Sequence, residues 1–278
     1  NFIRCNTLKI SPEKLIKKLS RWKIVQPFHN YPEIMIVKSE LMPGELGKAT
    51  EHLIGYYYIQ DISSMMPVLV LELSEKEITL DLCAAPGSKT TQIAAKMKNS
   101  GLLIANDNRI DRINVLAANM ERCGITNSII TKENAENLCE KIKNRIKFDK
   151  ILLDTSCSGE GVRDLKTFEI WNFNMIRKFA KDQKKLIASA LSALKENGIL
   201  VYSTCTLTPE ENEEVIQYAL DNFNVKVEKI ELPIKSREGI SEWNGEKFPS
   251  EIKNVKRIYP QDNDSEGFFV AKLRKGGE

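Results

Sequence analysis

Two cysteines of this sequence stand where a reactive thiol would be expected. Cys157 lies in Asp154-Thr155-Ser156-Cys157-Ser158-Gly159 and Cys205 in Ser203-Thr204-Cys205-Thr206, each directly after a predicted strand. A single cysteine is more often a small buried hydrophobe than a nucleophile, but these two are surrounded by small polar residues instead of an apolar run. Because the thiolate is the nucleophilic form of cysteine, the pair predicts covalent chemistry in an exposed turn.

A cofactor site beside these thiols is predicted by residues 78–90, which read Ile-Thr-Leu-Asp-Leu-Cys-Ala-Ala-Pro-Gly-Ser-Lys-Thr. A short β-type run turns through small residues into a helix, for which Ser88 is the expected N-cap. Such a unit opens a doubly wound α/β sheet and lets a nucleotide-like ligand approach the backbone. Gly87 is the only glycine here, so the fingerprint G-x-G-x-x-G is absent, which disfavours a nicotinamide or flavin cofactor. An ordinary strand-turn-helix unit without a ligand is the alternative.

From residue 78 onward, predicted strands and helices alternate, which is typical of a mainly parallel sheet. We predict an α/β protein with a Rossmann-like, doubly wound sheet of seven strands. The strands are expected near residues 78–82, 102–106, 127–131, 149–154, 199–204, 225–230 and 267–273, and the helices near 88–97, 109–122, 134–145, 175–196 and 209–222. Asn197-Gly198 is the expected left-handed end of the fourth helix, and residues 231–265 are expected to form a long excursion.

Functional groups in such a sheet gather at the carboxyl ends of the strands. In chain order these ends present Asp81-Leu82-Cys83, Asn106-Asp107-Asn108, Asn134 after a short loop, and the two cysteine turns. Asp107 is placed to bind ribose hydroxyls, as acids at the second strand end do in other nucleotide-binding folds. The two cysteines are therefore expected at adjacent strand ends, beside the cofactor.

The charge of the chain is unevenly distributed between two expected units, a small α+β segment over residues 1–60 and a main domain over residues 61–278. The first carries nine basic and five acidic residues, a net charge of +4, whereas the remainder carries −1. A basic segment on a near-neutral body suits contact with the phosphates of a nucleic acid. Solvated surface lysines are an equal alternative.

Within the first unit, a helix is predicted over Pro12–Lys23 with Ser11 as its N-cap. A short strand is predicted over Ile34–Val37. An apolar helix is expected to follow this unit, capped by Ser63 or Ser64.

Composition and cysteine usage limit the class of protein. The hydrophobic fraction of 42% and charged fraction of 28% are those of a globular domain, and no apolar run approaches the ~20 residues of a membrane span. The six cysteines include no C-x-x-C pair, which argues against a zinc site or a disulfide framework and for a reducing cytoplasm. Cys5, Cys123 and Cys139 are expected in the core. We therefore expect a cytoplasmic protein without bound metal or membrane contact.

Five motifs resemble, in order, those of the NOL1/NOP2/Sun family of RNA (cytosine-5-)-methyltransferases, with most similarity to its archaeal tRNA enzymes. They are Arg4-Cys5-Asn6-Thr7-Leu8-Lys9 for R-x-N-T-L-K, Tyr58-Ile59-Gln60-Asp61-Ile62-Ser63-Ser64 for Y-x-Q-D-x-S-S, residues 81–90 for D-x-C-A-A-P-G-G-K-T, residues 203–206 with Glu211-Asn212-Glu213 for S-T-C-T and E-N-E, and residues 266–271 for D-G-F-F-x-A. The resemblance covers nearly the whole chain and implies a class I methyltransferase fold.

Two departures from the family pattern matter. Ser156 stands where the family usually carries the proline of D-A-P-C, and serine does not restrict φ as proline does. The turn that aims Cys157 is therefore expected to be looser. Asn134 stands where the family often has an acid, and its amide can still bind the edge of adenine.

The resemblance implies a defined reaction. Carbon 5 of cytosine is a poor nucleophile, but addition of a thiolate to carbon 6 turns the ring into an enamine whose carbon 5 can take a methyl group from a sulfonium donor. The role of attacking thiol falls on Cys205, and Lys89 is a candidate to favour its thiolate. Asp154, if protonated or sharing a proton with ring nitrogen 3, would quench the charge that builds on the ring, which requires a raised pKa. Cys157 takes the family role in releasing the proton of carbon 5.

The resemblance also implies the cofactor, S-adenosylmethionine. It would lie over the loop made of Cys83, Ala84, Ala85, Pro86, Gly87, Ser88 and Lys89. Asp107 would hold its ribose and Asn134 its adenine, with Asp154 and Arg112 as further contacts. A solvated Arg112 is the equal alternative.

The implied partner is RNA, with tRNA favoured and ribosomal RNA as the alternative. The target cytosine must be unstacked to reach both thiols, so a single-stranded or flipped base is expected. Phe168, Trp171 and Phe173 could stack on flanking bases or pack against the following helix, and packing is slightly favoured. A catalytically silent RNA-binding module is the remaining alternative, and we expect a monomer.

Overall fold

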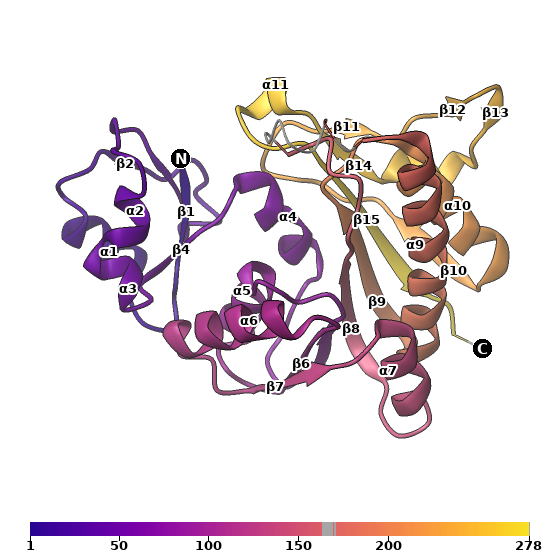
Figure 1. The fold of residues 1–278 in the computed structure, drawn as a ribbon, viewed down its shortest axis with the longest axis horizontal. Helices are drawn as coiled ribbons and strands as arrows, with labels where there is room; N and C mark the ends of the chain where they lie inside the picture. The colour runs from indigo at the N-terminus through magenta and orange to yellow at the C-terminus, as the bar shows by residue number, and fades with distance from the viewer. Residues whose placement is uncertain (163–168, 170, 278) are drawn as a thin grey trace.

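Two sheets organise the protein, whose computed structural model describes residues 1–162, 169 and 171–277. A small N-terminal sheet and a large main sheet are connected through α4 (Ile62–Val70) (Figure 1). None of the helices in the described part combines the length and the apolar character that crossing a bilayer requires.

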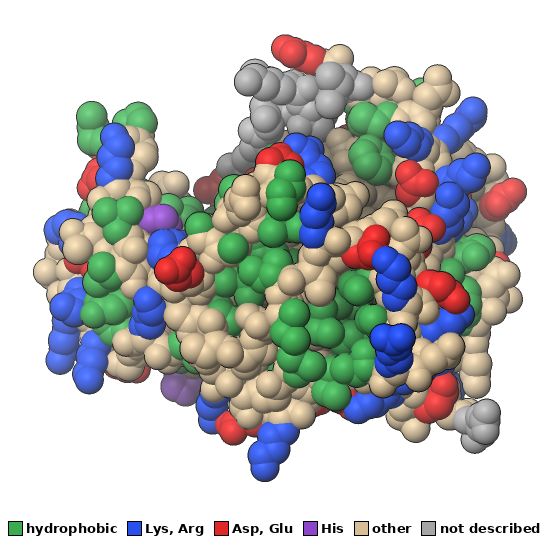
Figure 2. Space-filling view, turned by 60° about the horizontal axis from the view of Figure 1, so that its bottom comes forward, with side chains coloured by type: hydrophobic (Ala, Val, Ile, Leu, Met, Phe, Trp, Pro, Cys, Tyr) green, Lys and Arg blue, Asp and Glu red, His purple; other side chains and the backbone are tan. Residues whose placement is uncertain are grey.

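The N-terminal sheet is antiparallel and has the strand order β2-β3-β1-β4. Its elements are β1 (Phe2–Cys5), α1 (Pro12–Lys18), β2 (Ile24–Val25), β3 (Ile34–Val37), α2 (Glu45–Lys48), α3 (Thr50–Leu53) and β4 (Tyr57–Ile59). Ser11 caps α1 as predicted, but the helix ends at Lys18, because the buried Leu19 turns the chain toward β2. Figure 2 shows lysine and arginine side chains gathered at this end of the molecule, on its left.

The main sheet has nine strands, eight in the order β11-β14-β15-β9-β8-β5-β6-β7 and β10 paired with β15. They are β5 (Ile78–Asp81), β6 (Leu102–Asp107), β7 (Ser128–Lys132), β8 (Phe148–Asp154), β9 (Leu194–Thr204), β10 (Val225–Glu228), β11 (Arg237–Glu238), β14 (Lys256–Ile258) and β15 (Phe268–Lys275), while β12 (Glu242–Trp243) and β13 (Glu246–Lys247) form a separate hairpin. The five strands β5 to β9 pair in parallel, and β15 pairs antiparallel with β9, β10 and β14. The carboxyl ends of the parallel strands therefore meet at one edge.

Helices cover both faces of this sheet, as in a doubly wound fold (Figure 1). The remaining helices are α5 (Ser88–Lys96), α6 (Ile110–Cys123), α7 (Ala135–Ile142), α9 (Phe173–Ala193), α10 (Glu213–Asn222) and α11 (Pro260–Asn263), with 3-10 turns at Pro209–Glu211 and Ser250–Asn254. Successive strand residues point to opposite faces. Leu152 and Val201 accordingly pack with α4 and α5, whereas Leu153 and Tyr202 pack with α7, α9 and α10.

The seven predicted strands are present, but the sheet contains two more than predicted. β11 and β14 lie within residues 231–265, where only a long excursion was expected. They extend the antiparallel edge beyond β15. Strands of two and three residues are too short to show an alternating pattern in the sequence.

The long helix α9 ends earlier than predicted, at Ala193. Leu194 is fully buried and pairs with Phe148, so it already belongs to β9. Asn197 has the expected left-handed backbone, with a φ of 61°, but it lies within β9 where the pairing with β8 shifts register. Burial of Leu194 in the sheet thus overrides the helix-stop signal.

Two predicted helix caps are also corrected. Asp61 caps α4, because its Oδ1 accepts a hydrogen bond of 2.9 Å from the Ser63 N–H, in place of a cap by Ser63 or Ser64. Gly87 precedes α5, so Ser88 is the first helical residue and not the cap. Gly87 has a left-handed φ of 105°, and a Cβ there would lie 3.0 Å from Cδ1 of Leu116, so glycine suits this position.

The buried side chain of Arg4 joins the two sheets. Its Nε donates to Oε1 of Gln60 (2.9 Å), and its Nη2 donates to the Ser88 carbonyl (3.1 Å) and to Oγ1 of Thr91 (2.8 Å). Asn6 adds a second link, since its Nδ2 donates to the carbonyl of Cys123 (2.8 Å). Burial lowers the pKa of Arg4 to about 10. The first motif of the chain therefore holds the N-terminal sheet against the start of α5 and the end of α6.

Candidate active site

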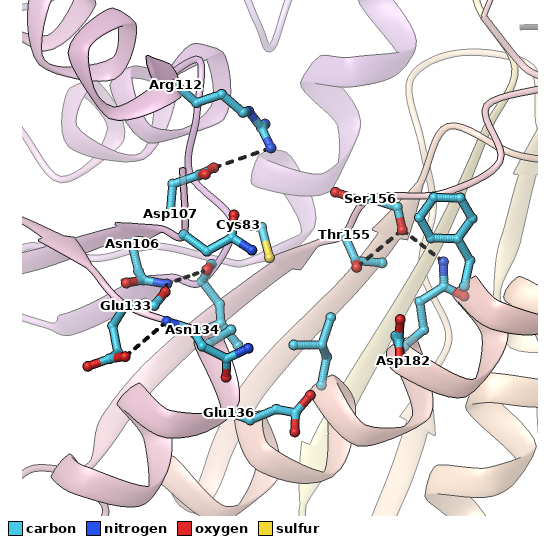
Figure 3. A pocket seen from close by; sticks show the side chains of 16 residues that line it. Cys83, Asn106, Asp107, Arg112, Glu133, Asn134, Glu136, Thr155, Ser156 and Asp182 are labelled. Carbon is cyan, nitrogen blue, oxygen red and sulfur yellow. Dashed lines mark hydrogen bonds and ion pairs between the residues drawn. The ribbon is translucent and has the colours of Figure 1, made fainter. Parts of the chain in front are cut away.

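Two adjoining pockets open at the carboxyl ends of β5, β6, β8 and β9. The first, of about 280 Å³, is lined by residues of the second and third strand ends and by one face of α9, among them Asn106, Asp107, Glu133, Asn134, Phe179 and Gln183 (Figure 3). The second, of about 360 Å³, is lined by Asp81, residues 83–86, Ser88, Lys89, residues 154–157 and Cys205. Cys83, Arg112, Thr155 and Ser156 line both, so the two pockets are direct neighbours.

The loop from Cys83 to Gly87 is tied to β6 by backbone contacts. The Ala84 N–H donates to the Asn106 carbonyl (2.7 Å), and the Ala85 N–H donates to Oδ2 of Asp107 (3.3 Å). The Ala85–Pro86 peptide bond is cis. Asp107 is buried and also accepts a hydrogen bond from the Arg109 N–H (3.1 Å). The expected ribose-binding acid thus lies in the first pocket and also shapes the loop.

Arg112 lies between the loop and Asp107. Its Nη1 is 3.4 Å from Oδ2 of Asp107, and its Nη2 donates to the Ala85 carbonyl. Because Arg112 lines both pockets, it is not a wholly solvated helix arginine. Its guanidinium group is already engaged by Asp107 and by the Ala85 carbonyl.

Asn134 lies in the first pocket and caps α7. Its Oδ1 accepts a hydrogen bond from the Asn137 N–H (3.1 Å), so that part of its amide is engaged by the helix. Glu133, which was not among the residues predicted from the sequence, precedes it in the same pocket. The Nδ2 of Asn106 donates to the Glu133 carbonyl (3.1 Å) and so connects the end of β6 to the residue before Asn134.

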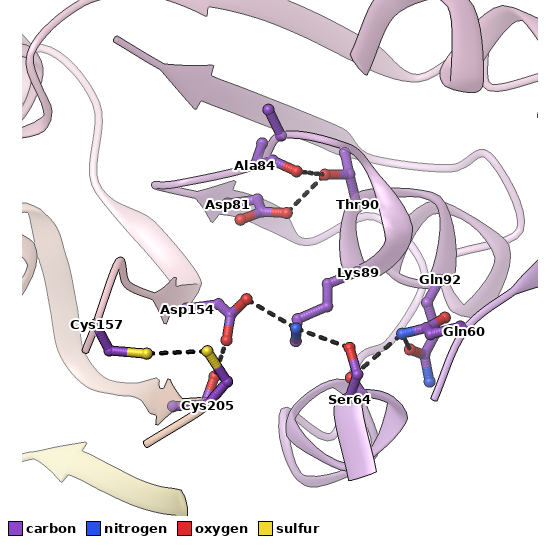
Figure 4. A network of polar contacts seen from close by, with 12 residues as sticks. Gln60, Ser64, Asp81, Ala84, Lys89, Thr90, Gln92, Asp154, Cys157 and Cys205 are labelled. Atoms are coloured by element: carbon purple, nitrogen blue, oxygen red, sulfur yellow. Dashed lines mark hydrogen bonds and ion pairs between the residues drawn. The ribbon is translucent and has the colours of Figure 1, made fainter. Parts of the chain in front are cut away.

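The two candidate thiols are in contact. Sγ of Cys157 and Sγ of Cys205 are 2.9 Å apart, and both cysteines are free and partly exposed (Figure 4). Cys157 follows β8 and Cys205 follows β9, which are neighbouring parallel strands. The hydrogen bond with Cys205, together with burial, raises the pKa of the Cys157 thiol. The two sulfurs are therefore linked by a hydrogen bond in which either can be the donor.

Lys89 and Asp154 form an ion pair next to the thiols (Figure 4). Nζ of Lys89 lies 2.7 Å from Oδ2 of Asp154 and donates to Oγ of Ser64 (2.9 Å), while the Ser203 hydroxyl donates to Oδ1 of Asp154 (2.6 Å). Both oxygens of Asp154 thus face hydrogen-bond donors. The expected role of Asp154 in quenching the charge on the ring stays a prediction. Ser64, from the second motif, had been considered only as a helix cap.

The aromatic residues after Cys157 differ from expectation. The rings of Trp171 and Phe173 lie 5.4 Å apart, and Nε1 of Trp171 donates to Oε1 of Glu160. Phe173 is 66% exposed, so the favoured packing role is wrong for this residue. Phe168 lies outside the described residues.

Two buried polar atoms near the pockets test whether a polar cofactor fits. Oδ2 of Asp81 accepts a hydrogen bond from the Thr90 hydroxyl (2.7 Å), but its Oδ1 has no hydrogen-bond partner in the described part of the chain. The same holds for Oε1 of Gln183, a fully buried residue of the first pocket. Burial raises the pKa of Asp81 to about 7. Because such orphaned acceptors are rare in folded proteins, both fit a ligand that supplies hydrogen-bond donors and positive charge.

Gln183 was not predicted from the sequence, although a signal existed. It lies on the buried stripe of α9, together with Ile176, Ala180 and Ile187. A glutamine on an otherwise apolar stripe of a helix needs hydrogen-bond partners and therefore marks a polar site.

The sheet, its antiparallel last strand and the pocket at the carboxyl ends of β5 and β6 define a class I methyltransferase fold. Residues 68–274 match the family described as 16S rRNA methyltransferase RsmB/F. The chain belongs to this RsmB/F, or NOL1/NOP2/Sun, family of S-adenosylmethionine-dependent RNA cytosine-5 methyltransferases, as the motifs indicated.

Relatives with two kinds of RNA substrate are equally similar. The chain is 42% identical to the tRNA (cytosine(49)-C(5))-methyltransferase of Pyrococcus abyssi over 231 residues, which are 82% of this chain and 73% of that protein. It is also 42% identical to the ribosomal RNA small subunit methyltransferase F of Psychromonas ingrahamii over 280 residues, covering 98% of this chain and 56% of that protein. The chain thus spans only slightly more than half the length of this ribosomal RNA relative.

Solved structures agree with the fold. A methyltransferase homolog protein from Pyrococcus horikoshii superposes with a TM-score of 0.87 at 36% identity, covering 99% of this chain and 86% of that chain. NSun6 from Pyrococcus horikoshii, solved with SFG, superposes with a TM-score of 0.84 at 27% identity, covering 100% and 91%.

Proposed function

We propose that this chain transfers a methyl group from S-adenosylmethionine to carbon 5 of cytosine in RNA, with tRNA as the substrate. The observation that carries the proposal is the pair of thiols 2.9 Å apart, on neighbouring strand ends. Beside them lie two buried acceptors for which the described residues supply no partner. A silent RNA-binding module has no use for an exposed thiol pair of this kind.

We assign separate steps of the reaction to separate residues of the site. S-adenosylmethionine, when bound by the loop 83–89 with Asp107 and Asn134, supplies an electrophilic methyl group. The Cys205 thiolate forms a bond to carbon 6 of cytosine, and the resulting electron density at carbon 5 takes up the methyl group. Cys157, once its own thiol proton has left to solvent, accepts the proton of carbon 5 as the bond between carbon 6 and Cys205 breaks and Cys205 leaves as a thiolate. Lys89, held by Asp154, places positive charge beside the ring during addition.

Affinity for S-adenosylmethionine is expected to fall as the pH is lowered through about 7. Asp81 has a pKa raised to about 7 by burial, so below that pH it is protonated and no longer presents negative charge to a cationic ligand. Calorimetric titration should show about a tenfold weaker affinity per pH unit on the acid side. Asp81→Asn should bind weakly and without this pH dependence, whereas a wild-type affinity constant from pH 8 to 5.5 would contradict the role of Asp81.

The RNA contact is assigned to the N-terminal segment, residues 1–60. A groove of about 620 Å³ between α1 and Tyr56 is lined by residues 7–11 and by the exposed side chains of Lys14, Lys17 and Lys18. Cations along an open groove suit the phosphates of a folded RNA.

Replacing Lys14, Lys17 and Lys18 together by glutamine is expected to weaken RNA binding and to leave the chemical step unchanged. The slope of log Kd against log salt concentration should fall by about 0.7 for each phosphate that the variant no longer neutralises. KM for RNA should rise while kcat stays near that of the wild type. A control in which Lys226, Lys247 and Lys253 are replaced by glutamine removes three exposed charges from the C-terminal part of the chain, and equally weakened binding in both variants would refute the assigned groove.

A ribosomal RNA substrate is the second candidate, because relatives acting on small-subunit RNA match 98% of this chain. Methyl transfer from radiolabelled cofactor to unmodified tRNA and to small-subunit ribosomal RNA separates the two substrates. We expect label in tRNA, and bisulfite sequencing of the product to locate a single cytosine. Label found only in ribosomal RNA would favour the second candidate, and RNA retention without label would favour a silent binder.

A further inference from the structure

A cluster of carboxyl and hydroxyl groups lies behind Cys157. Glu211, from the E-N-E motif, is fully buried, and both of its carboxyl oxygens accept a hydrogen bond from the Ser158 N–H (3.3 and 3.1 Å). Nε2 of Gln183 donates to Oε2 of Glu211 (2.8 Å) and to the Ser156 carbonyl (3.0 Å). The residues before and after Cys157 are thus held by one pair of side chains.

A second carboxyl group, that of Glu160, belongs to the same cluster. The Ser158 hydroxyl contacts Oε1 of Glu211 and lies 2.9 Å from Oε2 of Glu160, and the Thr206 hydroxyl also contacts Oε2 of Glu160. Ser158 and Thr206 are themselves 2.9 Å apart, and the Thr208 hydroxyl lies 3.1 Å from Oγ1 of Thr206. The Ser158 hydroxyl therefore links the two carboxyl groups directly. A longer route runs from Glu160 through Thr206 and Thr208, whose hydroxyl donates to Oε1 of Glu211 (3.2 Å).

The protons available do not fill these contacts if both carboxyl groups are ionised. The Ser158 hydroxyl has one proton but faces an oxygen of each carboxyl group, so one of the two contacts would then oppose lone pairs. One extra proton on Oε1 of Glu211 removes the conflict between the Ser158 hydroxyl and the two carboxyl groups. Glu211 then donates to Ser158, Ser158 donates to Glu160, and Oε2 of Glu211 still accepts from Gln183 and the Ser158 N–H.

We propose that Glu211 carries this proton, shares it with Glu160 through Ser158, and in this neutral form is the positioning residue that holds Cys157 against Cys205. Burial raises the pKa of Glu211, and the negative charge of nearby Glu160 raises it further. A raised pKa favours the protonated form of Glu211, as the contacts do. The proposal rests on the function proposed above, in which Cys157 serves the release step.

These hydrogen bonds compensate for the absence of the family's proline at position 156. Without the ring of proline, the backbone before Cys157 is free to rotate. In this chain Gln183 holds the Ser156 carbonyl and Glu211 holds the Ser158 N–H, so the turn is fixed by hydrogen bonds on both sides of the thiol. Glu211 comes from the strand end of Cys205, so the same side chain connects the two cysteine turns.

The test compares Glu211→Ala with Glu211→Gln. The amide of glutamine reproduces the protonated acid, since its Nε2 can donate to Ser158 while its Oε1 accepts from Gln183 and the Ser158 N–H. We expect Glu211→Gln to turn over close to the wild type. We expect Glu211→Ala to lose at least about tenfold in turnover and to accumulate a covalent enzyme–RNA adduct on denaturing gels, because a displaced Cys157 fails at release. Glu214→Ala, which removes a partly exposed carboxylate at the start of α10 that pairs with Lys184 of α9, should behave like the wild type.

Each result of the test is decisive. If Glu211→Gln is as impaired as Glu211→Ala, a charged carboxylate is required and the shared proton is wrong. If Glu211→Ala releases product normally, the positioning role is wrong. Should Glu211→Ala fail to fold in thermal melts, Ser158→Ala removes the bridging hydroxyl alone and must show the same adduct. The function itself fails separately, if the wild type methylates no RNA and Cys157→Ala traps no adduct.

Discussion

Replacing Cys205 by alanine is expected to abolish methyl transfer while S-adenosylmethionine still binds. Without its thiolate no bond forms to carbon 6, and carbon 5 of cytosine stays a poor nucleophile. Removal of a catalytic nucleophile costs at least about 10³-fold in comparable enzymes, so single-turnover transfer of a labelled methyl group should fall to background. Calorimetry should find cofactor affinity nearly unchanged, because the pocket of Asn106 and Asp107 does not include Cys205.

The matched control for this substitution is Cys139→Ala. Cys139 is a buried residue of α7 that packs in the core of the main sheet, and it lines neither pocket. It should retain methyl transfer, with only a loss of stability. Transfer that persists in Cys205→Ala would show that another group attacks the base.

Replacing Cys157 by alanine is expected to trap RNA on the enzyme. Addition and methylation need only Cys205, but the proton of carbon 5 then has no acceptor and the bond to carbon 6 cannot break. Denaturing gels with labelled RNA should show a stable adduct approaching one RNA per enzyme, with no second turnover.

The double substitution Cys157→Ala, Cys205→Ala provides the control and should give no adduct. A Cys157→Ala enzyme that yields only free, methylated RNA at the wild-type rate would remove this thiol from the release step.

The main sheet was predictable because its strands are long, apolar and separated by helices with clear periodicity. The ends of those strands could be read for chemistry, and Asp107, Asn134, Cys157 and Cys205 do come together around two neighbouring pockets. The short strands β11 and β14 were not predictable, since they exist only through pairing with β15 and its neighbours. Local pattern carries no information on such partners.

The partners of the charged groups in the site were also beyond the sequence. Lys89 reaches Asp154 from α5 and Ser203 reaches it from β9, and both contacts depend on the fold. Likewise Ser156 suggested a loose turn, but the turn is held by two distant side chains. Gln183 binds Ser156 from 27 residues further along the chain, and Glu211 binds Ser158 from 53 residues further along. Side chains that are distant in the sequence thus compensate for the missing proline, and only the folded structure shows that they lie beside it.

The contacts of Arg4 and Asn6 bear on how the chain could be divided. A shortened polypeptide starting at residue 61 would retain the Ser88 carbonyl, the Thr91 hydroxyl and the Cys123 carbonyl but discard the donors that reach them. It would also uncover the side of α5 and α6 on which those donors lie. The boundary near residue 60 therefore separates two sheets without separating two independent folding units, and a catalytic fragment made by cutting there is expected to be unstable.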